Sequence, residues 1–590
     1  MTKPAPPIFS WRTPLSQTVL FALVVTVLIV PVSFVVFFGL LPPFWLGASR
    51  GLLAETQYAY DITYAVVWNW AFSLMRRYLP ILPYAWYTYD WETTLQNDML
   101  WKSFLFRFWA TIFASAWVIV ILAIWKYFRT DRIQGFEYVS GPRLWENRTA
   151  IRRACAAIAA EASPPDKALQ MAPGLKLSIK RELASFAILG GQGSGKTTVL
   201  KFLFAQLCGQ KKTKLIVLDQ KGELTSQWPS SSVIFFAPHD QRSHAWNIGA
   251  DIVNEMDAQE FAATMIPAEG SETVWPQGAR QIAEAIVIAL QRLHGKNWGF
   301  SELLAAFQSS PVELRDMVKL VRSDVLSFLS LDERGEFTRT SIGYMTNLQA
   351  AMTPLLRPLA LSWGLAPKEK LVSLNSWLHG RGPQAQTLIL QNNTDYPTVS
   401  AGWMRQVIQR LVRITGSSAF PEFEVSGERL WFVLDEFPQL GRMPDLLRIP
   451  ATHRSKGVTL LLTAQSISQI YSTYSKDQAD TLLNLLQTKI ILNPGQGSDI
   501  VEQINRWIGK LRWRNPVESV VTEPGPGKPI PEYESDLISA AYMATLGQVG
   551  TKIYGLILGI GSDAYRMSWP LQKWPCQRPP VRLAHWADSE

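Results

Sequence analysis

The sequence predicts an α/β domain that carries an all-α insertion and is preceded by two transmembrane helices. Three observations support this prediction: a glycine-rich loop between an apolar run and a helical pattern, several short apolar runs that end in acidic or amide residues, and two long apolar stretches near the amino terminus. At 590 residues the chain is too long for one domain, and 47% hydrophobic residues is high for a purely soluble protein.

The two apolar stretches cover residues of about 19–41 and 108–125, and aromatic residues flank each one. At about 1.5 Å per residue, the first is long enough to cross a hydrocarbon core of roughly 30 Å. A cleaved signal peptide is the alternative for the first stretch, but no small-residue cleavage site follows it. A buried globular helix is the alternative for the second. We predict a membrane anchor over residues 1–130, with a segment of about 42–102 between the spans.

Residues 131–180 are predicted to connect this anchor to the α/β domain. Pairs of turn-forming residues, Gly141-Pro142 and Pro164-Pro165, bracket a helical pattern from about 148 to 162.

The glycine-rich loop fits the pattern G-x-x-x-x-G-K-[ST] at every fixed position. An apolar run at 186–189 predicts a strand before the loop, and residues 198–203 predict a helix after it. In this arrangement backbone N–H groups and the helix amino terminus surround phosphate oxygens. We expect Lys196 to reach the β and γ phosphates and Thr197 to bind Mg²⁺, so the chain is a candidate ATPase or GTPase. The predicted nucleotide-binding residues are Gly190, Gly191, Gln192, Gly193, Ser194, Gly195, Lys196, Thr197 and Thr198.

A second buried strand is predicted at 214–218, and it ends on Asp219. A carboxylate at this position is well placed to act on Mg²⁺ or on water, since the carboxyl ends of neighbouring strands meet at one edge. Glu223, four residues later, is a further candidate. The alternative for Asp219 is a turn residue.

The apolar run 430–434 ends in Asp435 and Glu436, which is the Walker B pattern. Asp435 is predicted to hold Mg²⁺ through water, and Glu436 to polarise the attacking water as general base. The next predicted strand, 458–463, is followed by Gln465, a candidate sensor of the γ phosphate. A glutamine that merely caps the following turn is the alternative.

The remaining pattern completes the domain division. Helical periodicity over 257–374 predicts an all-α domain, so the nucleotide-binding domain comprises 181–256 and 375–570, and a short tail covers 571–590. Cysteines and histidines lack metal-ligand spacing, so we expect no metal site beyond Mg²⁺. Further strands are predicted at 233–236, 387–390, 489–492 and 552–558, and a loop rich in proline and glycine at 524–531.

With these motifs the chain resembles the coupling ATPases of conjugation and type IV secretion, of the TraD/TraG type, within the FtsK–HerA group of RecA-like motors. The resemblance extends to about residue 569. The segments that carry it are Gly190–Thr198, Asp219–Glu223, Asp240–Ser243 with Trp246-Asn247, Leu430–Glu436, Leu440–Leu446, Arg454–Gly457 and Gln465-Ser466.

The resemblance implies a RecA-like motor that binds ATP and Mg²⁺ and assembles as a homohexamer in the bacterial inner membrane. It also implies delivery of a relaxase with attached single-stranded DNA (the relaxosome), or of effector proteins, to a type IV secretion channel. The family's arginine that acts across the subunit boundary matches Arg454, for which a surface arginine is the alternative. A cytoplasmic motor with two spans places the amino terminus in the cytoplasm as well and the segment of about 42–102 in the periplasm, and basic residues outside the spans agree.

Two other functions are alternatives. An ABC exporter needs more spans and an L-S-G-G-Q signature, and we find neither. A coupling or assembly ATPase that exports protein effectors without DNA is the stronger alternative. The net charge of +9 suits nucleic acid or an anionic membrane surface and does not decide between these cargoes. The chain also ends soon after the motor, whereas some family members carry an acidic carboxyl-terminal tail that recruits partners.

Overall fold

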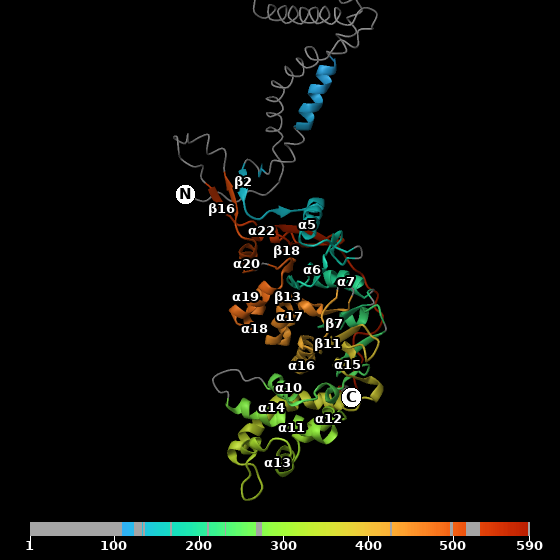
Figure 1. Ribbon diagram of the computed structural model, residues 1–590, viewed down its shortest axis with the longest axis vertical. Helices are drawn as coiled ribbons and strands as arrows, with labels where there is room; N and C mark the ends of the chain where they lie inside the picture. The colour runs from blue at the N-terminus through green and yellow to red at the C-terminus, as the bar shows by residue number, and fades with distance from the viewer. Residues whose placement is uncertain are drawn as a thin grey trace, which may run out of the picture. The chain divides into compact units, whose positions relative to one another are not determined.

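The protein is described here by a computed structural model (Figure 1). The described residues are 109–122, 132–133, 136–165, 168–208, 210, 212–230, 232–266, 274–424, 427–495, 499–514 and 532–587. The chain divides into two compact units, one formed by Met1–Gly141 with Leu511–Ser535 and the other by Pro142–Lys510 with Asp536–Glu590.

The smaller unit contains a helix at 109–122 and an antiparallel sheet that the sequence did not predict. This sheet joins segments far apart in the chain, since β2 pairs with β15. Trp513 stacks on Tyr533 with ring centroids 4.8 Å apart, and Arg512 pairs with Glu534 across the strands. The strands, in sheet order, are β1 (Arg132–Ile133), β2 (Phe136–Ser140), β15 (Leu511–Arg514) and β16 (Glu532–Ser535).

The predicted membrane anchor lies mostly outside the described residues, including the first span and the segment that follows it. The second predicted span is described only over 109–122, which is helical. Across the helices that the structure describes, none combines the length and the apolar character needed to cross a bilayer.

The larger unit is built on an 11-stranded sheet, which confirms the predicted α/β fold. Seven consecutive strands, which end with β8 at one side of the sheet, are parallel and include every one of the apolar runs predicted between 186 and 492. In sheet order they are β14 (Thr488–Ile491), β6 (Phe186–Leu189), β13 (Val458–Ala464), β12 (Arg429–Leu434), β7 (Thr213–Asp219), β11 (Thr387–Gln391) and β8 (Val233–Phe236). Beyond β14 the sheet continues with β18 (Lys552–Leu558), β19 (Ala564–Pro570) and β3 (Leu144–Trp145), while β17 (Gly547–Val549) pairs with β18.

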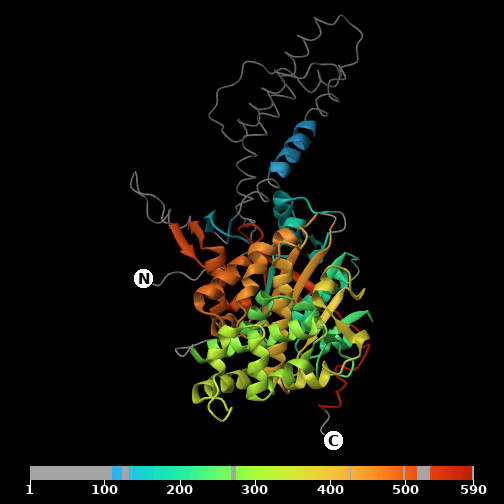
Figure 2. The ribbon, with the colours of Figure 1, turned by 60° about the horizontal axis from the view of Figure 1, so that its bottom comes forward.

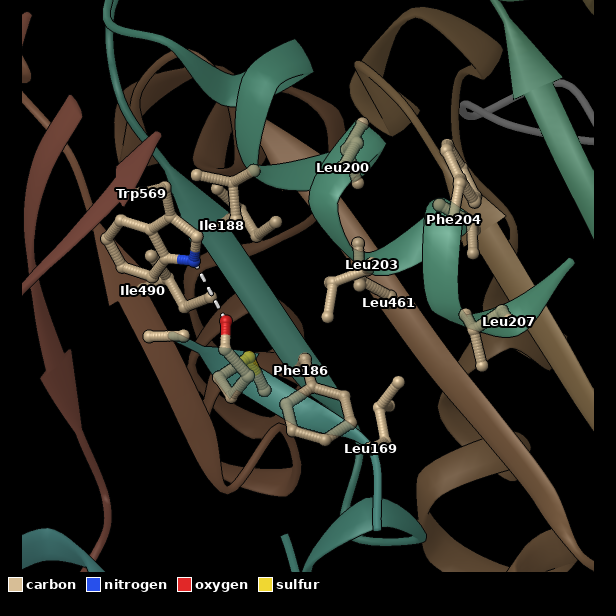
Figure 3. Close-up of a cluster of buried hydrophobic side chains, with 14 of the residues drawn as sticks. Leu169, Phe186, Ile188, Leu200, Leu203, Phe204, Leu207, Leu461, Ile490 and Trp569 are labelled. Atoms are coloured by element: carbon tan, nitrogen blue, oxygen red, sulfur yellow. Dashed lines mark hydrogen bonds between the residues drawn. The ribbon is translucent and has the colours of Figure 1, made fainter. Parts of the chain in front are cut away.

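One face of this sheet packs against α7 (Lys196–Leu207), as Figure 3 shows. Leu200, Leu203 and Phe204 of α7 are buried against Phe186 and Ile188 of β6. Each such side chain contributes about 1.5–3 kcal/mol when fully buried. Trp569 Nε1 donates a 2.8 Å hydrogen bond to the Met171 carbonyl at the edge of the cluster.

Alternate residues of the central strands point to the opposite face and are buried as well. Phe432 and Leu460 are both fully buried, although their neighbours Trp431 and Leu461 belong to the cluster beside α7. A parallel sheet covered on both faces explains why these strands are continuous apolar runs without alternation. Other helices of the unit are α5 (Asn147–Glu161), α6 (Ile179–Glu182), α8 (Glu223–Gln227), α16 (Pro397–Gly416), α17 (Arg448–Thr452), α18 (Ile467–Thr473), α19 (Lys476–Leu485), α20 (Asp499–Ile508) and α22 (Ala540–Met543).

The helical region predicted between the strands forms a group of helices next to α16 (Figures 1 and 2). Its longest helices pack through apolar stripes, and Ser310 begins α13 with a capping box that includes Glu313. The chain enters and leaves this group side by side, because β9 (Ala245–Trp246) pairs in parallel with β10 (Leu371–Val372). The members are α10 (Glu255–Met265), α11 (Val274–His294), α12 (Phe300–Phe307), α13 (Pro311–Lys319) and α14 (Arg339–Ser362).

Candidate active site

Apart from Arg454, the predicted site residues lie at or next to the carboxyl edge of the parallel sheet. The strand order β6, β13, β12, β7 places the glycine loop, Gln465, the Asp435-Glu436 pair and Asp219 at the ends of four adjacent strands. In open α/β sheets, ligands bind in the crevice at this edge.

The glycine loop connects β6 to α7 and requires glycine at two positions. Gly193 and Gly195 have φ values of 73° and 99°, a region that other L-residues rarely adopt. A side chain at position 195 would also come within 2.7 Å of Ile553. Neighbouring strands hold the loop, because Gly190 N donates to the Ala464 carbonyl at 3.2 Å and Gly191 N to the Asn493 carbonyl at 2.8 Å.

The Lys196 amine and the Glu436 carboxylate meet in this loop. Lys196 Nζ lies 3.1 Å from Glu436 Oε1, and the two side chains are only 9% and 10% exposed. The same amine donates to the Gly190 carbonyl at 2.7 Å. The predicted phosphate-binding residue and the predicted general base therefore share one buried site, although they lie 240 positions apart in the sequence.

The two acidic residues after β12 both form hydrogen bonds with the hydroxyl of Thr463 on β13. The Thr463 hydroxyl donates to Asp435 Oδ1 at 2.5 Å and accepts from the Glu436 backbone N–H at 2.9 Å. Burial raises the pKa of Asp435 to about 6, and the neighbouring Glu436 charge adds to this, while Thr463 and Lys196 oppose it. Sequence reasoning missed Thr463. Its position, two residues before Gln465 on the strand next to the acidic pair, was the available signal.

Glu436 also has an unusual backbone conformation. Its φ of 49° lies in the left-handed region, which a non-glycine residue seldom occupies. Such conformations cost on the order of 1–3 kcal/mol and concentrate at functional sites. Here the turn directs the carboxylate of Glu436 toward Lys196.

Asp219 is the last residue of β7 and Glu223 is the first residue of α8, and both have protein partners. Asp219 Oδ2 accepts from the Thr225 N–H at 2.6 Å and from the Thr225 hydroxyl at 2.7 Å. Burial raises the pKa of Asp219. Glu223 Oε1 pairs at 2.6 Å with Lys201 of α7.

Two further polar residues, Gln220 and Asn392, lie beside the acidic pair and were not predicted as site residues from the sequence. Gln220 Nε2 donates to the Asp435 carbonyl at 3.4 Å, and Asn392 Nδ2 donates to Gln220 Oε1 at 2.8 Å. Asn392 follows β11, so this network links the ends of β7, β11 and β12 behind the carboxylates.

The last two candidates lie at opposite edges of the sheet. Gln465 directly follows β13 at the carboxyl edge, beside the glycine loop, and its backbone N–H donates to Gln469 Oε1 at 3.3 Å. Arg454 precedes β13 at the other edge, where its exposed guanidinium donates to the Lys180 carbonyl at 2.9 Å. Seven strand residues, about 20 Å, separate these edges, so Arg454 does not reach the glycine loop of its own chain.

The residues present fit a nucleotide phosphate and a Mg²⁺ ion. Ser194 Oγ is buried at the loop and has no hydrogen-bond partner among the described residues. Thr197 and Thr198 lie on the first turn of α7, where backbone N–H groups lack helical partners. The Asp435 carboxylate and the Thr197 hydroxyl supply oxygen atoms, the ligand type that Mg²⁺ prefers.

Comparison with known families gives a match over residues 169–523, to the type IV secretion-system coupling protein DNA-binding domain. The chain belongs to this family. The resemblance drawn from the sequence motifs is thereby confirmed.

The sequence identity to individual coupling proteins is low. Coupling protein TraD of Escherichia coli (strain K12) is 24% identical over 311 residues, which cover 52% of this chain and 41% of TraD, less than half its length. The bacterial conjugative coupling protein TrwBdeltaN70 in its unbound monoclinic form is similar with a TM-score of 0.61 and 17% identity, over 77% of this chain and 100% of that one. The plasmid coupling protein TrwB in complex with ADP and Mg²⁺ gives a TM-score of 0.60 and 17% identity, over 76% and 98%. These structures share the fold.

Proposed function

We propose that this coupling protein is a membrane-anchored ATPase that drives cargo into a type IV secretion channel during conjugation. The observation that carries the proposal is the buried site in which Lys196 of the glycine loop lies 3.1 Å from Glu436 of the Walker B pair. If the glycine loop were an ordinary turn and Asp435-Glu436 an ordinary acidic end of a strand, there would be no reason for Lys196 and Glu436 to meet in one buried site. Binding of ADP with Mg²⁺ by the similar TrwB supports the choice of ligand.

The residues of the site have different roles in binding the nucleotide and in its hydrolysis. The loop residues Gly190–Thr198 bind the phosphates, with Lys196 at the β and γ groups. Glu436 accepts a proton from the attacking water, and Gln465 senses the γ phosphate from the next strand. Asp219 and Glu223 fix the loop after β7 through Thr225 and Lys201.

Thr197 and Asp435 are the residues that would hold Mg²⁺. When bound, the ion neutralises phosphate charge and so favours attack by water. Asp435 is kept in place for this role by the Thr463 hydroxyl.

We further propose that the active form is a homohexamer in which Arg454 acts on the site of a neighbouring subunit. Its place at the opposite edge of the sheet from the glycine loop supports a role between subunits, because it cannot serve its own loop. The predicted two-pass anchor would hold this ring at the inner membrane with the motor in the cytoplasm.

The cargo we propose is a relaxase with its attached single-stranded DNA, with or without protein effectors. Membership of a family described by its DNA-binding domain supports DNA. Export of protein effectors alone is the second candidate. Crosslinking in living donor cells separates the two: DNA should be recovered on the full-length protein, and less of it on Lys196→Ala. Recovery of secreted protein without DNA would favour the second candidate.

A further inference from the structure

We propose that Thr463 is a positioning residue for hydrolysis: its hydroxyl holds both acidic residues that follow β12 in the arrangement the reaction uses. The inference rests on the proposed ATPase function of this site. It assigns a role to a side chain that belongs to neither the glycine loop nor the Walker B pair.

The geometry of the hydroxyl supports this role. A hydroxyl has one hydrogen to donate, and Thr463 gives it to Asp435 Oδ1 at 2.5 Å, a distance typical of a bond to a carboxylate. The oxygen then accepts the Glu436 N–H at 2.9 Å. One atom thus fixes the carboxylate of the first acidic residue and the backbone of the second.

The backbone of Glu436 needs such a partner. Its left-handed φ of 49° is unfavourable for glutamate, and strained conformations persist only where neighbouring groups hold them. The hydrogen bond from the Glu436 N–H to the Thr463 hydroxyl helps to stabilise this backbone conformation. Without it, the turn can relax toward ordinary backbone angles and move the carboxylate away from Lys196.

The alternative is that Thr463 is an ordinary buried threonine whose hydroxyl needs any partner. The same strand provides the comparison. Thr459, four residues earlier on β13, is equally buried at 0% exposure, and its hydroxyl donates to the Glu182 carbonyl at 3.1 Å, away from the site. Thr459 therefore shows what a structural threonine does here, and it serves as a matched control.

The test compares Thr463→Val, Thr463→Ser and Thr459→Val in the full-length protein. Valine keeps the shape and removes the hydroxyl, whereas serine restores it. We expect Thr463→Val to lower kcat by about 10- to 100-fold with little change in KM, since outer partners of metal ligands typically have effects of this size. Thr463→Ser should recover most of the rate. Thr459→Val should keep kcat within about twofold of the wild type. Loss of a buried hydrogen bond away from the site is expected to lower the stability of the protein rather than its catalytic rate.

A second readout does not depend on turnover. Binding of a fluorescent ADP analogue, titrated with Mg²⁺, should need several-fold more Mg²⁺ in Thr463→Val, while binding in EDTA stays unchanged. If Thr463→Val does not fold, Thr463→Ala in the same assays replaces it, with melting temperature as the check on folding.

Each outcome has a defined meaning. If the wild type does not hydrolyse ATP, the proposed function fails. If the wild type is active and Thr463→Val matches Thr459→Val in both kcat and Mg²⁺ dependence, the positioning role is wrong. Failure of Thr463→Ser to recover activity would also overturn it.

Discussion

Lys196 and Glu436 lie in one buried site but are expected to act at different stages. Lys196 contacts phosphates in the ground state, whereas Glu436 acts on water during the reaction. Lys196→Ala should therefore weaken ATP binding, while Glu436→Gln should bind ATP normally and lower kcat by about 10²-fold or more. Equilibrium binding and steady-state hydrolysis measure the two effects. Equal turnover in Glu436→Gln and wild type would remove Glu436 from the catalytic role.

The buried Asp435 should make stability depend on pH. Its pKa of about 6 lies above the ordinary value of 3.8, so the folded protein holds the proton more tightly than the unfolded chain. Stability contributed by this group is present below about pH 4 and is lost as pH rises through 6.

Asp435→Asn removes the cost of burying the charge. In EDTA at pH 7.5, the variant should be more stable than the wild type, by on the order of 1–3 kcal/mol. The difference should vanish near pH 4. Urea unfolding at both pH values measures this, and a difference that did not change with pH would contradict the assignment.

At the level of elements, the carboxyl-terminal tail is attached to the motor at several points. Arg582 N–H donates to the buried Asp240 at 2.8 Å, and Arg242 donates to the Pro579 carbonyl at 2.9 Å. Trp586 Nε1 donates to the Pro238 carbonyl at 3.1 Å, and Trp574 packs edge-on against the buried Trp228. Although short, the tail is a structural part of the larger unit.

Deletion of residues 571–590 should lower the melting temperature by about 5 °C or more, because it removes several hydrogen bonds of about 1 kcal/mol each and exposes apolar surface. A chain that ends at Trp586 keeps these contacts and is the control. Calorimetry on both truncated proteins makes the comparison. Equal melting temperatures would mean that the tail contacts contribute no stability.

The short 3₁₀ element η6 (His453–Lys456) carries the proposed intersubunit arginine. Arg454→Ala should lose about 10³-fold or more in ATPase rate. Mixing it with Lys196→Ala subunits should restore part of the activity, because some interfaces then contain both groups. Mixtures no more active than either variant alone would show that Arg454 does not act across subunits.

Most of the sheet could be predicted from the sequence, because its central strands are buried on both faces. The runs 186–189, 233–236 and 552–558 match β6, β8 and β18 residue for residue. Long-range pairing could not be predicted. β2 and β15 join segments more than 370 residues apart, and β15 alternates buried and exposed residues over only four positions.

The site residues, too, could be predicted from the sequence only in part. Lys196, Asp435 and Glu436 are found by motif spacing, since phosphate and Mg²⁺ chemistry constrains them directly. Thr463 and Asn392 are found only once the strand order brings them to the acidic pair. Neither belongs to a motif, because hydrogen bonds between strands leave no fixed spacing in the chain.

At the scale of the whole molecule, we propose that ATP hydrolysis at this site is coupled to the movement of single-stranded DNA. A motor that moves DNA of any sequence needs cationic contacts to phosphates and no base-edge contacts. Stimulation by DNA should therefore tolerate changes of sequence and weaken steeply with salt. Each phosphate contacted should add about −0.7 to the slope of log affinity against log salt concentration.

The most direct test is the ATPase rate of the purified protein with single-stranded DNA across a salt series, beside a candidate secreted protein and with Lys196→Ala as the background. We expect DNA of unrelated sequences to raise the rate at low salt, with the stimulation fading as salt increases and absent in Lys196→Ala. A rate equal to that of Lys196→Ala, or stimulation by the secreted protein alone, would contradict the account.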